Sequence, residues 1–196
     1  MESGVVGGIA LTEYEDFGIA LNPEAIIDEC YEFDLYNGGV DIAFLGFAEV
    51  DAEGNVNVSK FGPILAGCGG FIDISQEAKK VVFCGTFTSH GLKIGVDSGN
   101  LHIRQEGKHK KFVKKVEQIT FSGEYARRKK QPVVLVTERA VFHLEEAGWV
   151  LTEMAPGVDI EKHIFPHVDF EVRVARTLKK IEKSILTWGG SGISTS

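Results

Sequence analysis

The sequence has 196 residues, of which 43% are hydrophobic and 25% are charged. These proportions are ordinary for a soluble globular protein and exclude a disordered or fibrous chain, and the length favours a single domain. The formal net charge of -7 argues against a nucleic-acid partner, because phosphate contacts require clustered lysines and arginines. No apolar run is long enough to cross a bilayer, so we expect no membrane partner either.

Cysteine and histidine usage predicts no metal site. The three cysteines are odd in number and form no CxxC pair, which indicates free thiols in a reducing, cytoplasmic compartment. A proline separates His163 from His167, so these two histidines are not expected to share a helix face. Basic runs at residues 108–111, 114–115 and 127–130 are interpreted as solvated surface, with contact to the phosphates of a nucleotide-like cofactor as the weaker alternative.

Helix and strand signals alternate through the first 90 residues. The Asn-Pro-Glu sequence at 22–24 predicts a helix start, with an N-cap, a first-turn proline and an acidic first turn. Apolar runs at 41–47 and 81–84 are typical of strands that are buried on both faces. A turn is expected over residues 51–55, and a short helix is expected to begin within residues 75–78.

Hairpin signals dominate the second half of the sequence. The elements predicted there are hairpins over 92–106 and 141–154, a buried strand over 133–137, and helices over 159–165 and 177–184. The combination predicts an α/β fold, with a Rossmann-like, open, mostly parallel sheet and an antiparallel hairpin extension. We expect one domain over residues 1–185, followed by a flexible tail at 186–196 that is rich in glycine and serine.

Two glycine-rich segments would let a ligand approach the main chain closely. Glu2 stands before the first segment, at residues 4–8, whose glycines would leave its carboxylate accessible. The second segment, at residues 67–70, precedes a predicted helix and offers N–H groups to negative charge. By spacing alone, an exposed glutamate beside a flexible turn is the better explanation of the first segment, and a tight turn between strands explains the second.

A longer series of motifs gives these segments a context. In chain order they are Glu-Ser-Gly-x-x-Gly-Gly from residue 2, Tyr-x-Gly-Gly-x-Asp from residue 36, Phe-Ala-Glu-Val-Asp-x-x-Gly-Asn-Val from residue 47, Gly-x-Gly-Gly-Phe-Ile-Asp-Ile-Ser from residue 67, Phe-Cys-Gly-Thr from residue 83, Thr-Glu-Arg-Ala-Val-Phe from residue 137 and Glu-Met-Ala-Pro-Gly-Val-Asp from residue 153. Over residues 2 to about 172 the chain resembles the C-terminal, beta-type half of family I coenzyme A transferases. The likeness is greatest to single-chain bacterial enzymes that act on acetyl, propionyl or acetoacetyl groups.

The resemblance implies that Glu2 is the nucleophile. Its carboxylate would attack an acyl-CoA thioester to give a mixed anhydride and CoA thiolate, which would then form a glutamyl-CoA thioester and release the free acid. A second carboxylic acid would reverse these steps and leave as the new acyl-CoA. The N–H groups of Gly69 and Gly70 would stabilise the oxyanion. Gly67 would complete a loop that faces Glu2, and Gly4 would line the same CoA-binding site.

The resemblance also implies partners and substrates. Family members have an N-terminal, alpha-type half and a strand that leads into the glutamate, so we expect this chain to be a fragment or a subunit that is folded but inactive alone. The completed enzyme is expected to be a homo-oligomer in short-chain fatty acid or ketone body metabolism. Coenzyme A would be a substrate, and no permanently bound cofactor is implied. An acyl-CoA hydrolase, in which water replaces the acceptor acid, is the alternative activity.

Overall fold

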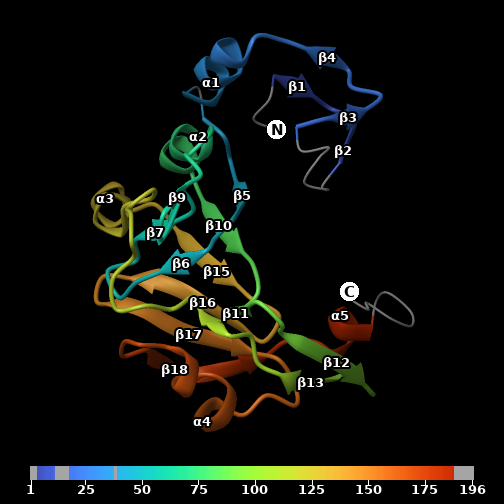
Figure 1. The fold of residues 1–196 in the computed structure, drawn as a ribbon, viewed down its shortest axis with the longest axis vertical. Coiled ribbons are helices and arrows are strands. Elements are labelled where there is room, and N and C mark those ends of the chain that lie inside the picture. The colour runs from blue at the N-terminus through green and yellow to red at the C-terminus, as the bar shows by residue number, and fades with distance from the viewer. Residues whose placement is uncertain (1–3, 12–17, 38, 188–196) are drawn as a thin grey trace.

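The computed structural model describes residues 4–11, 18–37 and 39–187, and its centre is one six-stranded sheet (Figure 1). The strand order is β18–β17–β16–β15–β10–β5. The strands are β5 (Ala43–Gly46), β10 (Val81–Cys84), β15 (Val133–Val136), β16 (Ala140–Glu145), β17 (Gly148–Met154) and β18 (Arg173–Lys180). β5, β10 and β15 are parallel, β15, β16 and β17 form an antiparallel meander, and β18 runs parallel to β17.

This arrangement confirms the predicted Rossmann-like α/β sheet with an antiparallel extension. β10 and β15 are the short, largely buried apolar runs that the sequence predicted. β5 lies at the edge of the sheet and its Phe44 is 66% exposed, so the expectation that this strand is buried on both faces is wrong. Val81 of the middle strand lies opposite Val133 on one side and Ala43 on the other, and all three are buried. The hairpin predicted over 141–154 supplies β16 and β17, which extend the sheet as expected.

Short antiparallel pairs make up much of the remaining chain. They are β1 (Val5–Val6) with β4 (Ala25–Ile26), β2 (Ile9–Ala10) with β3 (Ala20–Leu21), β6 (Glu49–Val50) with β7 (Val56–Asn57), β8 (Lys60–Phe61) with β9 (Ile64–Leu65), β11 (Thr88–Ser89) with β14 (His109–Lys110), and β12 (Lys93–Asp97) with β13 (Asn100–Gln105). The hairpin predicted over 92–106 is therefore present, but it does not join the central sheet as we expected. Its side chains are mostly exposed, and Leu101 anchors it by donating its N–H to the carbonyl of Pro156 at 2.7 Å.

Six short helical segments complete the described structure. They are α1 (Glu29–Asn37), α2 (Phe71–Glu77), α3 (Gly123–Lys129), α4 (Ile160–His163), the 3-10 helix η2 (Phe165–His167) and α5 (Lys183–Thr187). Among the helices of the described residues, none has both the length and the hydrophobicity that crossing a membrane requires.

Three predicted helices are wrong in position. The helix expected to begin within residues 75–78 is α2, which begins at Phe71 and ends at Glu77. Asn22 does not cap a helix, because its φ of 51° places it in a left-handed turn between β3 and β4, a conformation that asparagine tolerates. The chain then pairs with Val5–Val6 as β4, and the helix begins only at Glu29. Residues 177–180 belong to strand β18, whose pairing with β17 outweighs their helical spacing.

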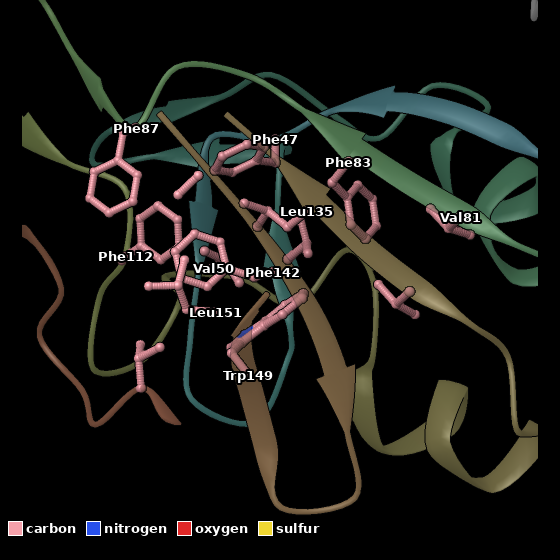
Figure 2. Close-up of a cluster of buried hydrophobic side chains, with 14 of the residues drawn as sticks. Phe47, Val50, Val81, Phe83, Phe87, Phe112, Leu135, Phe142, Trp149 and Leu151 are labelled. Carbon is pink, nitrogen blue, oxygen red and sulfur yellow. The ribbon is translucent and has the colours of Figure 1, made fainter. Parts of the chain in front are cut away.

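The core is a layer of aromatic and aliphatic side chains against the central sheet (Figure 2). Phe112 lies at its centre, with its ring centroid 4.4 Å from that of Phe87 and 5.3 Å from that of Phe142. Trp149 is also buried, and its indole N–H donates to the carbonyl of Asp51 at 2.8 Å. Each aromatic ring buried in this way contributes about 2 kcal/mol.

Candidate functional site

Glu2 lies outside the described residues, so its position and its surroundings stay a prediction. The description begins with Gly4, whose N–H donates to the Glu32 carboxylate at 2.5 Å and whose carbonyl accepts the N–H of Ile27 at 2.8 Å. Gly4 has a φ of +74°, and a Cβ there would lie 2.1 Å from the carbonyl oxygen of Ile27. Only glycine fits this position, which fixes the main chain two residues after the predicted nucleophile.

Glu32 is a buried acid that sequence reasoning missed. Only 3% of its surface is exposed, and it accepts hydrogen bonds from the Gly4 N–H at 2.5 Å and the Tyr36 hydroxyl at 2.6 Å. Because Glu32 belongs to α1, it ties the segment after Glu2 to that helix. A lone glutamate within a short acidic helix carries no motif, so the sequence offered no signal for this contact.

The Gly67–Gly70 loop has the backbone that its composition predicted. Gly67 and Gly69 have φ values of +84° and +51°, which is the left-handed region that favours glycine. Gly70 is the N-cap of α2, and its neighbour Phe71 donates its N–H to Cys68 O at 3.0 Å. Within the described part of the chain, the N–H groups of Gly69 and Gly70 donate to no acceptor; Gly69 is exposed, whereas Gly70 is buried.

The two glycine segments lie toward the same end of the molecule. Figure 1 shows β1 beside α1, with α1 directly next to α2, and these two helices are in contact. Gly4 is held on α1 through Glu32, and Gly70 caps the start of α2. The packing of the two helices therefore connects Gly4 with the Gly67–Gly70 loop. That this loop faces Glu2 stays a prediction.

Two residues of the motif at 137–142, Glu138 and Arg139, belong to a buried ionic cluster elsewhere, after the carboxyl end of β15. Arg139 is fully buried and pairs with Glu106 and with Glu138, each at 2.6 Å. Burial acts to raise the pKa of Glu106, but its hydrogen bonds and attraction to Arg139 outweigh that effect and lower the pKa. Burial lowers the pKa of His167, which lies 3.3 Å from the same carboxylate. With each charge partnered inside the protein, these residues serve the fold.

The expectation that the basic runs are solvated surface is wrong for one lysine. Lys111 is 7% exposed, with its ammonium 3.7 Å from the centroid of the Phe47 ring and close to Gly85. Burial lowers its pKa to about 8, against a smaller opposing effect of Glu138. Lys111 directly follows β14, whose two side chains are both exposed, and the face of the Phe47 ring partly compensates its buried charge. Lys111 is thus not placed to bind a solvated phosphate.

Metal-ligating groups do not gather in the region that the structure covers. Within residues 4–11, 18–37 and 39–187, no three or more His, Cys, Asp or Glu side chains are placed to hold a metal ion together. Cys30, Cys68 and Cys84 are free thiols.

Comparison with known proteins identifies relatives of this chain. No protein-family model matches the chain. Acetate CoA-transferase YdiF of Escherichia coli O157:H7 is 45% identical over 186 residues, which are 94% of this chain and 35% of that protein. Its crystal structure as a thioester complex with CoA has a TM-score of 0.86 at 44% identity, with the same coverage of 94% and 35%. Caffeate CoA-transferase of Acetobacterium woodii is 42% identical over 200 residues, 99% of this chain and 38% of the relative.

The chain is a homologue of the CoA-transferases. It also matches an acetate CoA-transferase subunit beta of Haemophilus influenzae, with 35% identity over 136 residues that cover 68% of the chain and 51% of the subunit. This CoA-transferase homologue therefore corresponds to the beta-type half, as the motifs indicated. It spans 35% and 38% of the lengths of the two longer relatives, so most of each relative has no counterpart in it.

Proposed function

We propose that this chain is the beta-type half of an enzyme that transfers coenzyme A from a short-chain acyl-CoA to a free carboxylic acid. The observation that carries the proposal is the 45% identity, with a TM-score of 0.86, to an acyl-CoA transferase of E. coli O157:H7. Acetate is the favoured acid, because two of the relatives are named for it. Propionate and acetoacetate rest on the motif resemblance alone. Coenzyme A is a substrate in this proposal, with no resident cofactor.

The mechanism begins at Glu2. Its carboxylate oxygen attacks the thioester carbon, the carbon–sulfur bond breaks, and a mixed anhydride and CoA thiolate result. The thiolate then attacks the glutamyl carbonyl, which expels the carboxylate of the original acyl group and leaves glutamyl-CoA. The incoming acid reverses both steps, so the thioester is exchanged and never hydrolysed. The role of Glu2 is supported by its motif.

Each addition step generates an oxyanion that needs hydrogen-bond donors. Gly69 and Gly70 are suited to this role, since their N–H groups have no acceptor among the described residues. Gly67 gives the loop its left-handed entry, and Gly4 holds the chain after Glu2 against α1. These four glycines are proposed as the oxyanion and CoA-binding positions.

The complete enzyme requires an alpha-type half, which a relative named as a beta subunit implies for its own assembly. We propose that this chain contributes one domain, over residues 1–185, with 186–196 as a tail, to a homo-oligomer in the cytoplasm. The free thiols of Cys30, Cys68 and Cys84 suit a reducing compartment. Neither nucleic acid nor membrane is proposed as a partner.

Trapping the covalent intermediate tests the proposal. The chain, completed with its alpha-type half, is incubated with propionyl-CoA and acetate, and CoA exchange is measured. Hydroxylamine or borohydride is then added to trap glutamyl-CoA, and the modified peptide is mapped by mass spectrometry. We expect a tag on Glu2 that disappears in Glu2→Gln together with turnover, while Glu146→Gln, in an exposed hairpin turn, retains both. Unchanged turnover in Glu2→Gln, or a tag on another carboxylate, contradicts the mechanism.

A further inference from the structure

The Gly67–Gly70 loop is held at its base by one main-chain carbonyl. The oxygen of Ser59 accepts the N–H of Ala66 at 2.9 Å and the N–H of Gly67 at 3.1 Å. Between these contacts lies the β8–β9 hairpin, whose apolar side chains pack little: Phe61, Ile64 and Leu65 are 39%, 62% and 71% exposed. Because the hairpin lacks a packed face of its own, Ser59 sets where the loop begins, whereas the buried Phe71 of α2 sets where it ends.

Asn57 fixes the turn that presents Ser59. It is fully buried, and its side-chain oxygen accepts the N–H groups of Ser59 at 3.0 Å and Lys60 at 3.1 Å. Its side-chain amide donates to Glu49 at 2.8 Å and to the Lys60 carbonyl at 2.7 Å. All four hydrogen-bonding positions of an asparagine are thus occupied, so no other side chain reproduces the set.

Thr120 holds the same turn from a distant part of the chain. Its hydroxyl lies 2.7 Å from the Ser59 hydroxyl and accepts the N–H of Val58 at 3.2 Å. Thr120 is 5% exposed and Ser59 is 1% exposed, so water does not replace these contacts readily. Thr120 itself is fixed because its own N–H and that of Phe121 both donate to the carbonyl of Val56.

We propose that Thr120, acting with Asn57 through Ser59, is a positioning residue for the oxyanion N–H groups of Gly69 and Gly70. The proposal rests on the proposed function, because it assigns these N–H groups a role in the transfer reaction. Thr120 does not touch the loop or the substrate. Its hydroxyl sets the place of Ser59, whose carbonyl sets the entry of the loop, so that the two donors are already aligned when the oxyanion forms.

A matched pair of substitutions at one position separates positioning from bulk stability. Thr120→Val keeps the shape of the side chain and removes the hydroxyl, whereas Thr120→Ser keeps the hydroxyl and removes a methyl group. In the completed enzyme, Thr120→Val is expected to lower kcat by about 10- to 100-fold with KM little changed. Thr120→Ser is expected to restore kcat to near the parent value. Ser59→Ala breaks the same hydroxyl contact from the other side and replaces Thr120→Val if that variant does not fold.

Amide hydrogen exchange supplies the second readout, in peptides that contain Ala66 and Gly67. We expect faster exchange in Thr120→Val and in Ser59→Ala, and parent-like exchange in Thr120→Ser. Parent-like exchange in both hydroxyl-free variants overturns the positioning role. Faster exchange with an unchanged kcat also overturns it, because the loop is then held by Thr120 without serving catalysis. A completed parent enzyme that exchanges no CoA contradicts the proposed function instead, whatever the exchange data show.

Discussion

Arg139 and Glu106 form a two-point ion pair, in which the two terminal guanidinium nitrogens lie 2.6 and 3.0 Å from the two carboxylate oxygens. The same guanidinium donates to Glu138 at 2.6 Å and to the carbonyl of His163 at 2.9 Å. It lies 4.8 Å from the centroid of the Phe87 ring. A fully buried cation is stable only when it is compensated in this way, so this cluster joins the β12–β13 hairpin and α4 to the central sheet.

Glu106→Gln is expected to destabilise the protein by about 2–4 kcal/mol, because it leaves part of the buried Arg139 charge uncompensated. The matched control is Glu145→Gln, which breaks an ion pair with Arg173 whose side chains are 53% and 46% exposed. That control should cost less than about 1 kcal/mol. Urea denaturation at pH 7 measures both, and equal midpoints for the two variants would contradict the assignment.

Acid should remove the contribution that Glu106 makes to the stability of the folded protein. Its folded pKa lies below the ordinary value of 4.5, so the carboxylate binds protons less readily in the folded state than in the unfolded state. Its stabilising contribution is therefore complete above the unfolded pKa and is lost as the pH falls through the folded pKa. The loss of stability between pH 6 and pH 3 should be smaller in Glu106→Gln than in the parent, as measured by denaturation at each pH.

Lys111→Met should stabilise the protein at pH 7. Burial lowers the pKa of Lys111 from 10.5 to about 8, a difference that corresponds to at most about 3 kcal/mol of unfavourable charge burial. The folded state binds fewer protons than the unfolded state between these two values, so the parent gains stability as the pH rises through that range. The advantage of Lys111→Met should therefore shrink between pH 8 and pH 10.

The neighbouring lysine provides the control for this experiment. Lys110 forms an ion pair with Asp169 at 2.6 Å, and the two side chains are 42% and 37% exposed. Lys110→Met should change stability by less than about 1 kcal/mol, with no gain at pH 7. If both methionine variants shift the urea midpoint alike, the burial of Lys111 is not the cause.

Gly123→Ala should destabilise the protein by about 2–4 kcal/mol. A Cβ at Gly123 would lie 2.1 Å from the carbonyl oxygen of Glu53 and 2.7 Å from the carbonyl carbon of Gly54, and main chain moves less easily than a side chain. Gly46→Ala is the matched control, because an added Cβ there meets no atom within 4 Å. Thermal unfolding of both variants tests this. A Tm that is lowered in Gly46→Ala and not in Gly123→Ala would contradict the prediction.

Glu117 holds the tip of the β8–β9 hairpin, and its pKa should lie below the ordinary value of a glutamate. Its carboxylate accepts the N–H of Gly62 at 2.7 Å and pairs with Lys60 at 3.3 Å. The hydrogen bond from Gly62, and then the contacts with Lys60, lower its pKa below 4.5. An NMR titration of the Gly62 amide should have its midpoint below that value. In Lys60→Met the midpoint should rise, and a midpoint at or above 4.5 in the parent would refute the contact.

The sequence predicts those parts of the fold that local patterns determine. The runs at 81–84 and 133–137 are strands because they are apolar throughout, and the hairpin at 141–154 closes over a short turn. Residues 22–26 and 177–180 were predicted wrongly because strand pairing with distant residues overrides their helical spacing. Nothing local indicates that a partner strand is present.

The residues of the candidate site also differ in whether local sequence patterns or contacts between distant residues reveal them. Gly4, Gly67 and Gly69 were identified from the sequence through the family motifs, and each has the positive φ that glycine tolerates. Glu32 and Ser59 were not identified, since Glu32 acts through a contact across 28 residues and Ser59 through its main-chain carbonyl. A carbonyl is present in every residue, so its use leaves no mark in the sequence. The catalytic role of Glu2 stays a prediction.

The connectivity of the central sheet has a consequence for the order in which the protein assembles. β15, β16 and β17 are consecutive and antiparallel, so they can pair after closing only short loops. β5 must instead find β10 across a long intervening segment that includes the Gly67–Gly70 loop. We expect the meander to form early and this segment to order late. By the same reasoning, local unfolding that releases the Gly67–Gly70 loop should cost less free energy than unfolding of the meander, which contains Trp149.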